Sequence, residues 1–314
     1  MTYTHSLTLA SGSKMPLLGM GVWKVPKNAA ADTVYNAIKA GYRLLDCAAD
    51  YGNEVEVGQG IRQAISEGLV TRADLFVTSK LWNTYHAKEH VPQACRRTLD
   101  DLGLDYVDLY LIHFPIALKY VPFEERYPAE WGNFEVDPVP VHETWAAMEE
   151  LVHKGWAKNI GVSNFSAALL MDVLSYCKIR PAVLHIEVHP YLSNNAMIDY
   201  AHKEGLAVQA YSSFGPQSYL EIGVNTGIKS LFEQEVLKKI GERHGKSIAQ
   251  VILRWLVQKK VAVIPKSNNP VRVVENAQLF DFELTAEEMS DIEKLNKDFR
   301  INDPGVYAQI PIFA

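Results

Sequence analysis

Four side chains in the first half of the sequence have the types needed to protonate an oxygen: Asp46, Tyr51, Lys80 and His113, each at or just after the end of an apolar run. The phenol of Tyr51 has an ordinary pKa of about 10, so it is a poor acid near neutrality unless a cation favours its phenolate. Lys80 could supply that cation, Asp46 could keep the lysine charged, and His113 could hydrogen-bond a substrate oxygen. Such a set suits protonation of an alkoxide that forms on a carbonyl carbon. Because it holds no obvious nucleophile or metal ligand, the hydride would come from a cofactor.

Each of these residues also has a purely structural interpretation when it is taken alone. A histidine in YLIHFP is often a hydrogen-bonded core residue, Lys80 could be a solvated strand end, and Asp46 could be a buried turn acid. Four polar groups at the same end of consecutive strands are harder to explain in this way, because burying them would be costly without a purpose. We therefore favour the catalytic interpretation.

Eight short apolar runs predict buried β-strands. They cover residues 16–21, 43–47, 75–80, 107–114, 159–163, 182–188, 207–212 and 261–267. Between them, apolar residues recur three or four positions apart, as in Val57, Ile61 and Ile65, which predicts amphipathic helices. Strands that alternate with helices require parallel crossover connections, and eight such units favour a closed (β/α)8 TIM barrel, an α/β fold, over a doubly wound sheet. The run GMGVWK also lacks the third glycine of a dinucleotide fingerprint.

We expect residues 1–314 to form a single domain. Its opening segment, SLTLASGSKMPLLGMG, predicts a β-hairpin that turns on Gly12. Two connections are longer than a barrel needs and are expected to be structureless loops: 115–140, which shows no helical period, and 213–231, which is rich in glycine and serine. Long loops of this kind inside a compact domain are usually functional.

These elements would place the catalytic candidates at one end of the barrel. The second, third and fourth strands close on Asp46, Lys80 and His113, and active sites of such barrels lie at the carboxyl ends of the strands. Asn53, three residues before a glutamate, has the spacing of a capping box, so a helix would begin just after Tyr51. Tyr51 would then face the same mouth.

Composition narrows the class of partner and compartment. The chain has 31 basic and 37 acidic residues, a net charge of −6 and no basic stripe, which argues against nucleic acid. Cys47, Cys95 and Cys177 are scattered and form no metal-binding or disulfide pattern, so we expect no metal site and a reducing, cytoplasmic location. No apolar run is long enough to span a membrane, and the opening residues do not resemble a signal peptide.

A phosphate-binding loop is expected after the eighth strand, where barrels of this type frequently bind phosphate. The run IPKSNNPVRVVENAQ at 264–278 offers Lys266, Ser267 and Arg272. Arginine with lysine at one site is what a ribose 2′-phosphate would require. An ordinary basic loop remains the alternative.

Seven motifs together resemble the aldo-keto reductases along essentially the whole chain. They are GVWK, LDCAADYGNEVEVG, SKLWN, DLYLIHFP, GVSNF, PAVLHIEVHPYL and AVIPKSNNPVRVVEN, and they occur in the family's order. Within that family the chain is most similar to the fungal xylose reductases, through HFPIALKY, AYSSFGPQS and RINDP followed by IPIF.

The resemblance implies that Asp46, Tyr51, Lys80 and His113 are a catalytic tetrad with Tyr51 as proton donor, and that NADPH lies extended over the mouth without a Rossmann domain. At the nicotinamide it implies Ser163, Asn164, His185 and Tyr211, and along the pyrophosphate Ser212, Phe214, Gly215, Gln217 and Ser218. Around the 2′-phosphate and adenine it implies Lys266, Ser267, Asn268, Arg272, Glu275 and Asn276. The substrate would contact Trp23, Asp50, His113 and Asn302.

Three features depart from the xylose reductase pattern or modulate it. His185 stands where the family has a glutamine, and a histidine cannot reproduce both functions of an amide. Gly305 and Tyr307 occupy a region in which xylose reductases often carry tryptophan. Glu221 matches a residue that helps some of those enzymes to accept NADH as well as NADPH.

The function expected from the residues and the resemblance is NAD(P)H-dependent reduction of an aldose, D-xylose to xylitol first, by an enzyme that is a monomer or a homodimer. Two alternatives stay open. One is a reductase of other carbonyls, such as a sugar acid, a sugar phosphate or an aromatic aldehyde. The other is an NADPH-binding sensor without useful catalysis.

Overall fold

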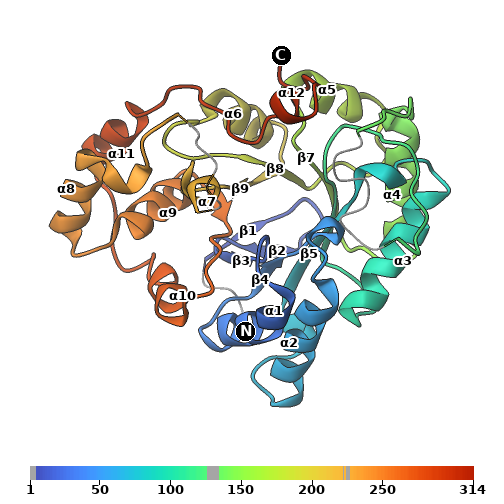
Figure 1. Ribbon diagram of the computed structural model, residues 1–314, viewed down its shortest axis with the longest axis horizontal. Helices are drawn as coiled ribbons and strands as arrows, with labels where there is room; N and C mark the ends of the chain where they lie inside the picture. Colours follow the sequence, from blue (N-terminus) through green and yellow to red (C-terminus); the bar gives the residue numbers. More distant parts are fainter. Residues whose placement is uncertain (1–4, 126–133, 222, 224–226) are drawn as a thin grey trace.

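Eight parallel strands form a barrel in the computed structural model, which describes residues 5–125, 134–221, 223 and 227–314 (Figure 1). The strands follow one another round the barrel in chain order: β3 (Gly19–Gly21), β4 (Leu44–Asp46), β5 (Phe76–Leu81), β6 (Leu109–Ile112), β7 (Ile160–Ser163), β8 (Val183–Glu187), β9 (Ala207–Tyr211) and β10 (Val261–Val263). A parallel bridge between Leu18 and Val263 joins the last strand to the first. The predicted barrel and its eight strands are therefore confirmed.

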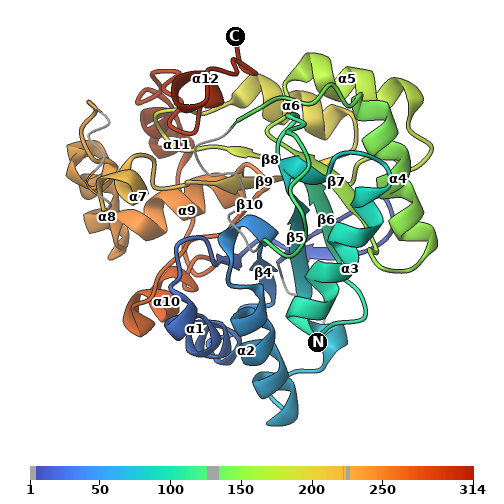
Figure 2. The same cartoon turned by 45° about the vertical axis from the view of Figure 1, so that its right-hand side comes forward.

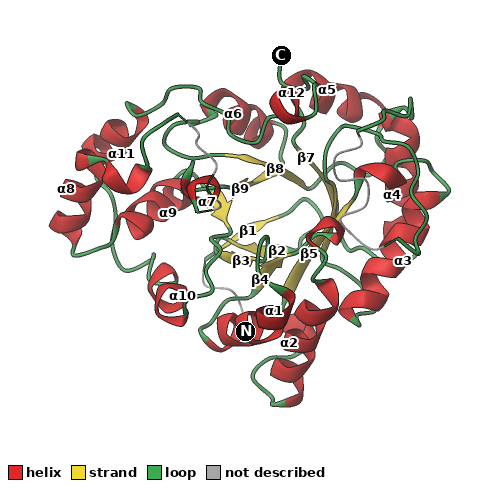
Figure 3. Ribbon diagram, viewed as in Figure 1, coloured by secondary structure: helices red, strands yellow, loops and turns green. Residues whose placement is uncertain are grey.

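Helices surround this barrel on its outer side (Figure 3). They are α1 (Lys27–Lys39), α2 (Glu54–Ser66), α3 (His90–Leu102), α4 (Val141–His153), α5 (Ala167–Tyr176), α6 (Asn195–Lys203), α7 (Gln217–Leu220), α8 (Glu235–His244), α9 (Ile248–Gln258), α10 (Pro270–Asn276), α11 (Ala286–Glu293) and α12 (Pro304–Tyr307). The turned view shows α2 and α3 outside β4 and β5 (Figure 2).

Helix α3 illustrates why these segments fold as they do. Val91, Cys95 and Leu99 recur at helical spacing and are fully buried against the sheet, whereas Arg96 faces solvent. The helix ends at Gly103, whose φ of 65° is in the left-handed region that favours glycine. Apolar periodicity thus predicts both the helix and the face that it buries.

A hairpin closes the amino end of the barrel. Strand β1 (Ser6–Thr8) pairs antiparallel with β2 (Lys14–Pro16), as predicted. Met15 of β2 has no accessible surface. It belongs to a cluster of apolar side chains that also contains Leu44, Phe76 and Leu109, the first residues of three barrel strands. The open end is consequently the carboxyl end.

Two local predictions are wrong. Helix α2 begins directly after Asn53, as predicted, but the Asn53 side chain does not cap it: its Oδ1 has no hydrogen-bond partner, and its NH2 group donates to the carbonyl oxygens of Val22 and Val25, each at 3.0 Å. The connection 213–231 is not without structure, since it contains α7. Residues 126–133 of the other long connection, and 222 and 224–226 of this one, lie outside the described residues.

In the described ranges, no helix combines the length and the apolar character that crossing a bilayer would require.

Candidate active site

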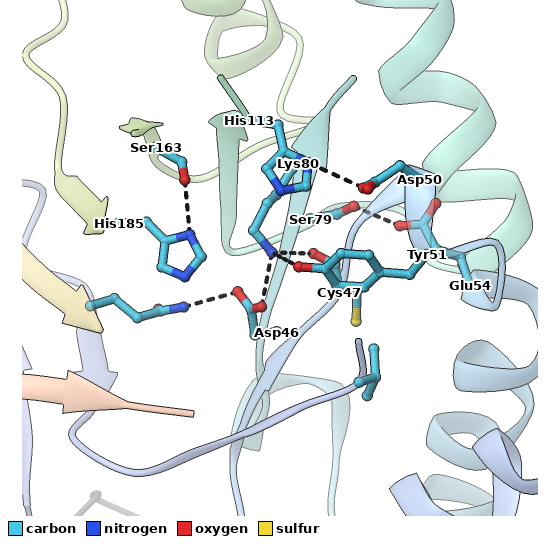
Figure 4. Close-up of polar contacts among 12 residues, drawn as sticks. Asp46, Cys47, Asp50, Tyr51, Glu54, Ser79, Lys80, His113, Ser163 and His185 are labelled. Atoms are coloured by element: carbon cyan, nitrogen blue, oxygen red, sulfur yellow. Dashed lines mark hydrogen bonds and ion pairs between the residues drawn. The ribbon is translucent and has the colours of Figure 1, made fainter. Parts of the chain in front are cut away.

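The four catalytic candidates come together at the carboxyl end of the barrel (Figure 4). Asp46 is the last residue of β4, Lys80 is the last but one of β5, and His113 directly follows β6. Tyr51 ends a single 3-10 turn, Ala49–Tyr51, that leads from β4 towards α2. Adjacent parallel strands thus bring these side chains together, as the sequence predicts.

Lys80 is the centre of the cluster. Its Nζ lies 2.8 Å from Asp46 Oδ2 and donates to the carbonyl oxygen of Cys47 at 2.8 Å and to the Tyr51 hydroxyl at 3.1 Å. The lysine has no accessible side-chain surface, and only 2% of the Asp46 side chain is exposed. A buried charge pair needs good geometry and further hydrogen bonds to be tolerated, and this pair has both.

Tyr51 is held as a protonated phenol. Burial raises its pKa well above the ordinary value, and the charges of Asp46 and Asp50 raise it further. In the protein without substrate, burial and the two carboxylates therefore keep the phenol protonated, and a role for Lys80 in favouring the phenolate during proton transfer stays a prediction. The hydroxyl keeps its proton until a strong base, such as an alkoxide, comes within reach.

His113 is oriented by Asp50. Its Nδ1 lies 3.1 Å from Asp50 Oδ1, and each side chain is 9% exposed. The imidazole ring also packs edge-on to Tyr51 and to Trp82, with centroid distances of 6.0 and 5.4 Å. Since Asp50 engages one ring nitrogen, Nε2 is the atom left to meet a substrate oxygen.

A polar pocket lies beside the tetrad on β7, β8 and β9. Tyr211 donates to Asn164 Oδ1 at 2.5 Å, and Asn164 donates to Ser163 Oγ at 3.1 Å and to the His113 carbonyl at 2.9 Å. Ser163 Oγ lies 3.1 Å from His185 Nδ1. The four residues expected at the nicotinamide are thus neighbours, and they offer hydroxyl, amide and imidazole groups that suit a carboxamide.

His185 in this pocket is neutral. It is 2% exposed, and burial, followed by the charges of Lys80 and His113, lowers its pKa well below the ordinary value. A neutral imidazole has one donor and one acceptor nitrogen. It therefore resembles an amide in polarity, although not in shape.

Positive charge gathers at another corner of the mouth. Lys24 Nζ lies 4.0 Å from the ring centre of Trp23 and 4.8 Å from that of Tyr219, and Lys266 Nζ lies 3.7 Å from Glu221 Oε2. Burial and the charge of Lys266 lower the pKa of Lys24 to about 8, against a smaller rise from Glu221. Two cations sharing one carboxylate fit a phosphate group, as a phosphate-bearing cofactor requires.

The low pKa of Lys24 predicts a pH dependence of cofactor binding. Below about pH 8 the lysine is charged and attracts phosphate, and above it the charge is lost. We expect the affinity for NADPH to weaken by about tenfold as pH rises through this value. Fluorescence titrations with NADPH, carried out below and above pH 8, measure this change in affinity.

Two variants at Lys24 serve as its controls. Lys24→Arg keeps the charge and should move the transition out of range, whereas Lys24→Met should bind weakly at every pH without a step. A Lys24→Met variant that retains the step would show that another group is responsible.

The other residues expected around the cofactor follow β9 and β10. Gln217 accepts from Ser230 Oγ at 2.9 Å, Phe214 packs on Phe232, and Ser212 has a φ of 50°. The side chain of Ser218 lies outside the described part of the chain. After β10, Ser267 and Asn276 are buried, whereas Asn268 and Arg272 are exposed.

The start of α10 is well defined. Asn269 caps it by accepting from the backbone N–H of Val271 and Arg272. Gly215 has a φ of 58°, in the left-handed region that favours glycine, and Glu275 lies in α10 beside Asn276. The expected pyrophosphate, 2′-phosphate and adenine residues thus lie in the segments that follow β9 and β10.

Two expected substrate contacts also border the mouth. Trp23 follows β3 and packs at 6.0 Å from Tyr219. Asn302 donates to the Tyr211 hydroxyl at 3.4 Å and accepts from Tyr307 at 3.1 Å.

The sequence reasoning missed two residues of this region. Gln209 of β9 has no exposed surface and donates to Asp46 Oδ1 at 2.9 Å, so it holds the carboxylate that holds Lys80. Lys24 stands in the quoted GVWK run but was not assigned a role. A polar residue inside the apolar run AVQAYS was the available signal for Gln209.

Comparisons with known proteins agree on one family. The model of the "Aldo/keto reductase family" matches residues 15–297. A probable NAD(P)H-dependent D-xylose reductase of Aspergillus clavatus is 55% identical over 307 residues, covering 96% of this chain and 93% of its own. An NAD(P)H-dependent D-xylose reductase of Candida tropicalis is 53% identical over 315 residues, covering 98% and 97%.

Solved structures give the same result. A Bombyx mori aldo-keto reductase in complex with NADP matches with a TM-score of 0.89 at 36% identity, covering 100% of this chain and 99% of its own. The aldose reductase of Schistosoma japonicum matches with a TM-score of 0.86 at 38% identity, covering 95% and 94%.

Proposed function

Since the chain belongs to the aldo/keto reductase family, we propose that it reduces the aldehyde of an aldose, D-xylose to xylitol first, with NADPH as cofactor and NADH as a second choice. Family and relatives make it an NAD(P)H-dependent oxidoreductase. The choice of D-xylose as the substrate rests on the names of relatives that are 53–55% identical over nearly the whole chain.

One observation carries the catalytic assignment: the Tyr51 hydroxyl lies 3.1 Å from a buried lysine that is itself paired with Asp46. When bound, NADPH supplies the hydride for the carbonyl carbon. His113 orients the carbonyl oxygen, and Tyr51 donates its proton to that oxygen as negative charge develops there. Lys80 then stabilises the phenolate that remains, and Asp46 and Gln209 keep the lysine in place.

We also propose roles for the surrounding pocket. Ser163, Asn164 and His185 hold the carboxamide, and Tyr211 stacks on the nicotinamide ring. Lys24 and Lys266 neutralise phosphate, and Trp23 and Asn302 bound the substrate. Asp50 acts through His113, because its carboxylate lies against Nδ1 of that ring.

A substrate panel followed at the nicotinamide absorbance tests this function. D-xylose, other aldoses, glucuronate, an aldose phosphate and an aromatic aldehyde are each compared with NADPH and with NADH, and the xylose product is identified as xylitol. We expect turnover of D-xylose with both cofactors and a higher kcat/KM for NADPH. Aldose values far below those for glucuronate or the aromatic aldehyde would favour a different carbonyl. Binding of NADPH without turnover of any compound would favour a sensor.

Several further expectations stay predictions: a single domain over residues 1–314, a cytoplasmic location, a monomer or homodimer, and no role for nucleic acid.

A further inference from the structure

A carboxylate that the catalytic cycle does not use is buried beneath the mouth. Glu187, the last residue of β8, has no accessible surface. Its Oε1 accepts from the backbone N–H of Ile301 at 2.9 Å and lies 2.8 Å from His189 Nε2, and its Oε2 accepts from the N–H of Asn302 at 2.9 Å. Both carboxylate oxygens of Glu187 are therefore occupied by hydrogen-bond partners.

These contacts fasten the C-terminal segment to the barrel. The carbonyl oxygen of Tyr191, in the loop after β8, accepts from the N–H of Lys297 at 3.1 Å and of Phe299 at 3.0 Å. Beyond them the segment continues through α12 and ends near the start of α5, where Ala314 lines one small pocket with Phe165 and Ser166, the two residues before that helix (Figure 1). Glu187 and the loop after β8 thus hold residues 297–302 by backbone hydrogen bonds.

Asn302 is the residue whose position depends most directly on this attachment. Glu187 binds its backbone, and its side chain then contacts the hydroxyls of Tyr211 and Tyr307. Tyr211 in turn donates to Asn164 in the expected nicotinamide pocket. One carboxylate therefore holds the backbone of Asn302, whose amide contacts Tyr211 and Tyr307.

We propose that Glu187 is a positioning residue that determines specificity, because it fixes Asn302 where this amide can hydrogen-bond the hydroxyl groups of a polyhydroxylated aldehyde. This inference rests on the proposed function, since it requires that a sugar is a substrate. A carboxylate is needed because two backbone donors converge on its two oxygens. A glutamine would point an NH2 group at one of these N–H donors and leave that contact without an acceptor.

The variant Glu187→Gln tests the proposal through a contrast between two substrates. We expect KM for D-xylose to rise about tenfold, the factor for loss of one substrate hydrogen bond, with kcat changed less than about threefold. For an aromatic aldehyde without hydroxyl groups, KM should stay at the wild-type value. A fluorescence titration should show unchanged NADPH affinity.

Glu149→Gln is the matched control. Glu149 of α4 is also buried and also accepts from two backbone N–H groups, those of Lys178 at 2.6 Å and Ile179 at 2.8 Å, but it does so before β8, at the closed end of the barrel. Because both N–H groups donate to one oxygen, Oε1, a glutamine can still accept from them, so Glu149→Gln should lower Tm less than Glu187→Gln and leave both KM values unchanged. Asn302→Ala should reproduce the xylose effect, and adding Glu187→Gln to it should raise KM no further.

The outcomes separate the two hypotheses. An unchanged xylose KM in Glu187→Gln, or an equal rise for both substrates, would overturn the role of Glu187. A wild-type protein that reduces no sugar would instead overturn the proposed function. If Glu187→Gln does not fold, Glu187→Asp carries the test, because it keeps the charge but is one methylene short of the loop, and its xylose KM should rise selectively.

Discussion

Replacing Tyr51 with phenylalanine is expected to lower kcat for aldose reduction by about a thousandfold, which is within the range for loss of a general acid. The aromatic ring keeps its packing on His113, at 6.0 Å, and its place beside Lys80, at 4.9 Å, so the mouth should keep its shape. Only the hydroxyl group is removed, and with it the transferable proton and the acceptor of one Lys80 hydrogen bond. Initial rates with saturating NADPH and aldose measure the loss, and a fluorescence titration should give an unchanged Kd for NADPH.

The matched control removes a phenol hydroxyl away from the mouth. Tyr35 of α1 donates to Glu67 at 2.6 Å on the surface, and Tyr35→Phe should leave kcat unchanged. A Tyr51→Phe protein that binds NADPH and loses little turnover would contradict the role of Tyr51 as proton donor.

Replacing Lys80 with methionine is expected to affect both stability and rate. Asp46 would remain buried without its cation, which costs about 3–5 kcal/mol of folding free energy. The phenolate that forms at Tyr51 would lose its nearest positive charge, so kcat should fall by about a hundredfold or more. Denaturant unfolding and steady-state kinetics measure the two effects separately.

A double variant separates the two effects. Lys80→Met with Asp46→Asn removes the uncompensated charge, so it should recover much of the stability while kcat stays low. Lys259→Met, which breaks a half-buried pair with Glu293 at 2.9 Å, is the control and should leave kcat unchanged. Recovery of activity in the double variant would show that Lys80 matters only for folding.

The sequence predicts the barrel well because its signals are local. Each strand is a short apolar run between polar or glycine-containing segments, and α3 carries its periodicity in consecutive turns. Asp46 and Lys80 could be placed at one mouth because parallel strands put their carboxyl ends on one side.

The errors and omissions have a different origin. Asn53 has capping-box spacing and directly precedes α2, yet its NH2 group is tied to the carbonyl oxygens of Val22 and Val25, distant in the sequence, and its Oδ1 caps no N–H group. Gln209 and Glu187 find their partners 163 and up to 115 residues away, so no local pattern contains those pairs. What the sequence does offer is a polar residue in a buried strand, which is a reason to look for a distant partner.

The pKa of Tyr51 could not be predicted for a related reason. Its direction depends on how much water burial removes and on two nearby carboxylates, and both are properties of the packed mouth. Sequence identifies the lysine that favours phenolate but not the balance against it.

The hairpin at the amino end has a kinetic consequence. With Met15 sealed beneath the strands, bulk water reaches Tyr51 through the carboxyl mouth, the same opening that the alditol must use to leave. Reprotonation of the Tyr51 phenolate therefore depends on product release. An alditol that dissociates slowly would delay this reprotonation as well as the exchange of the oxidised cofactor.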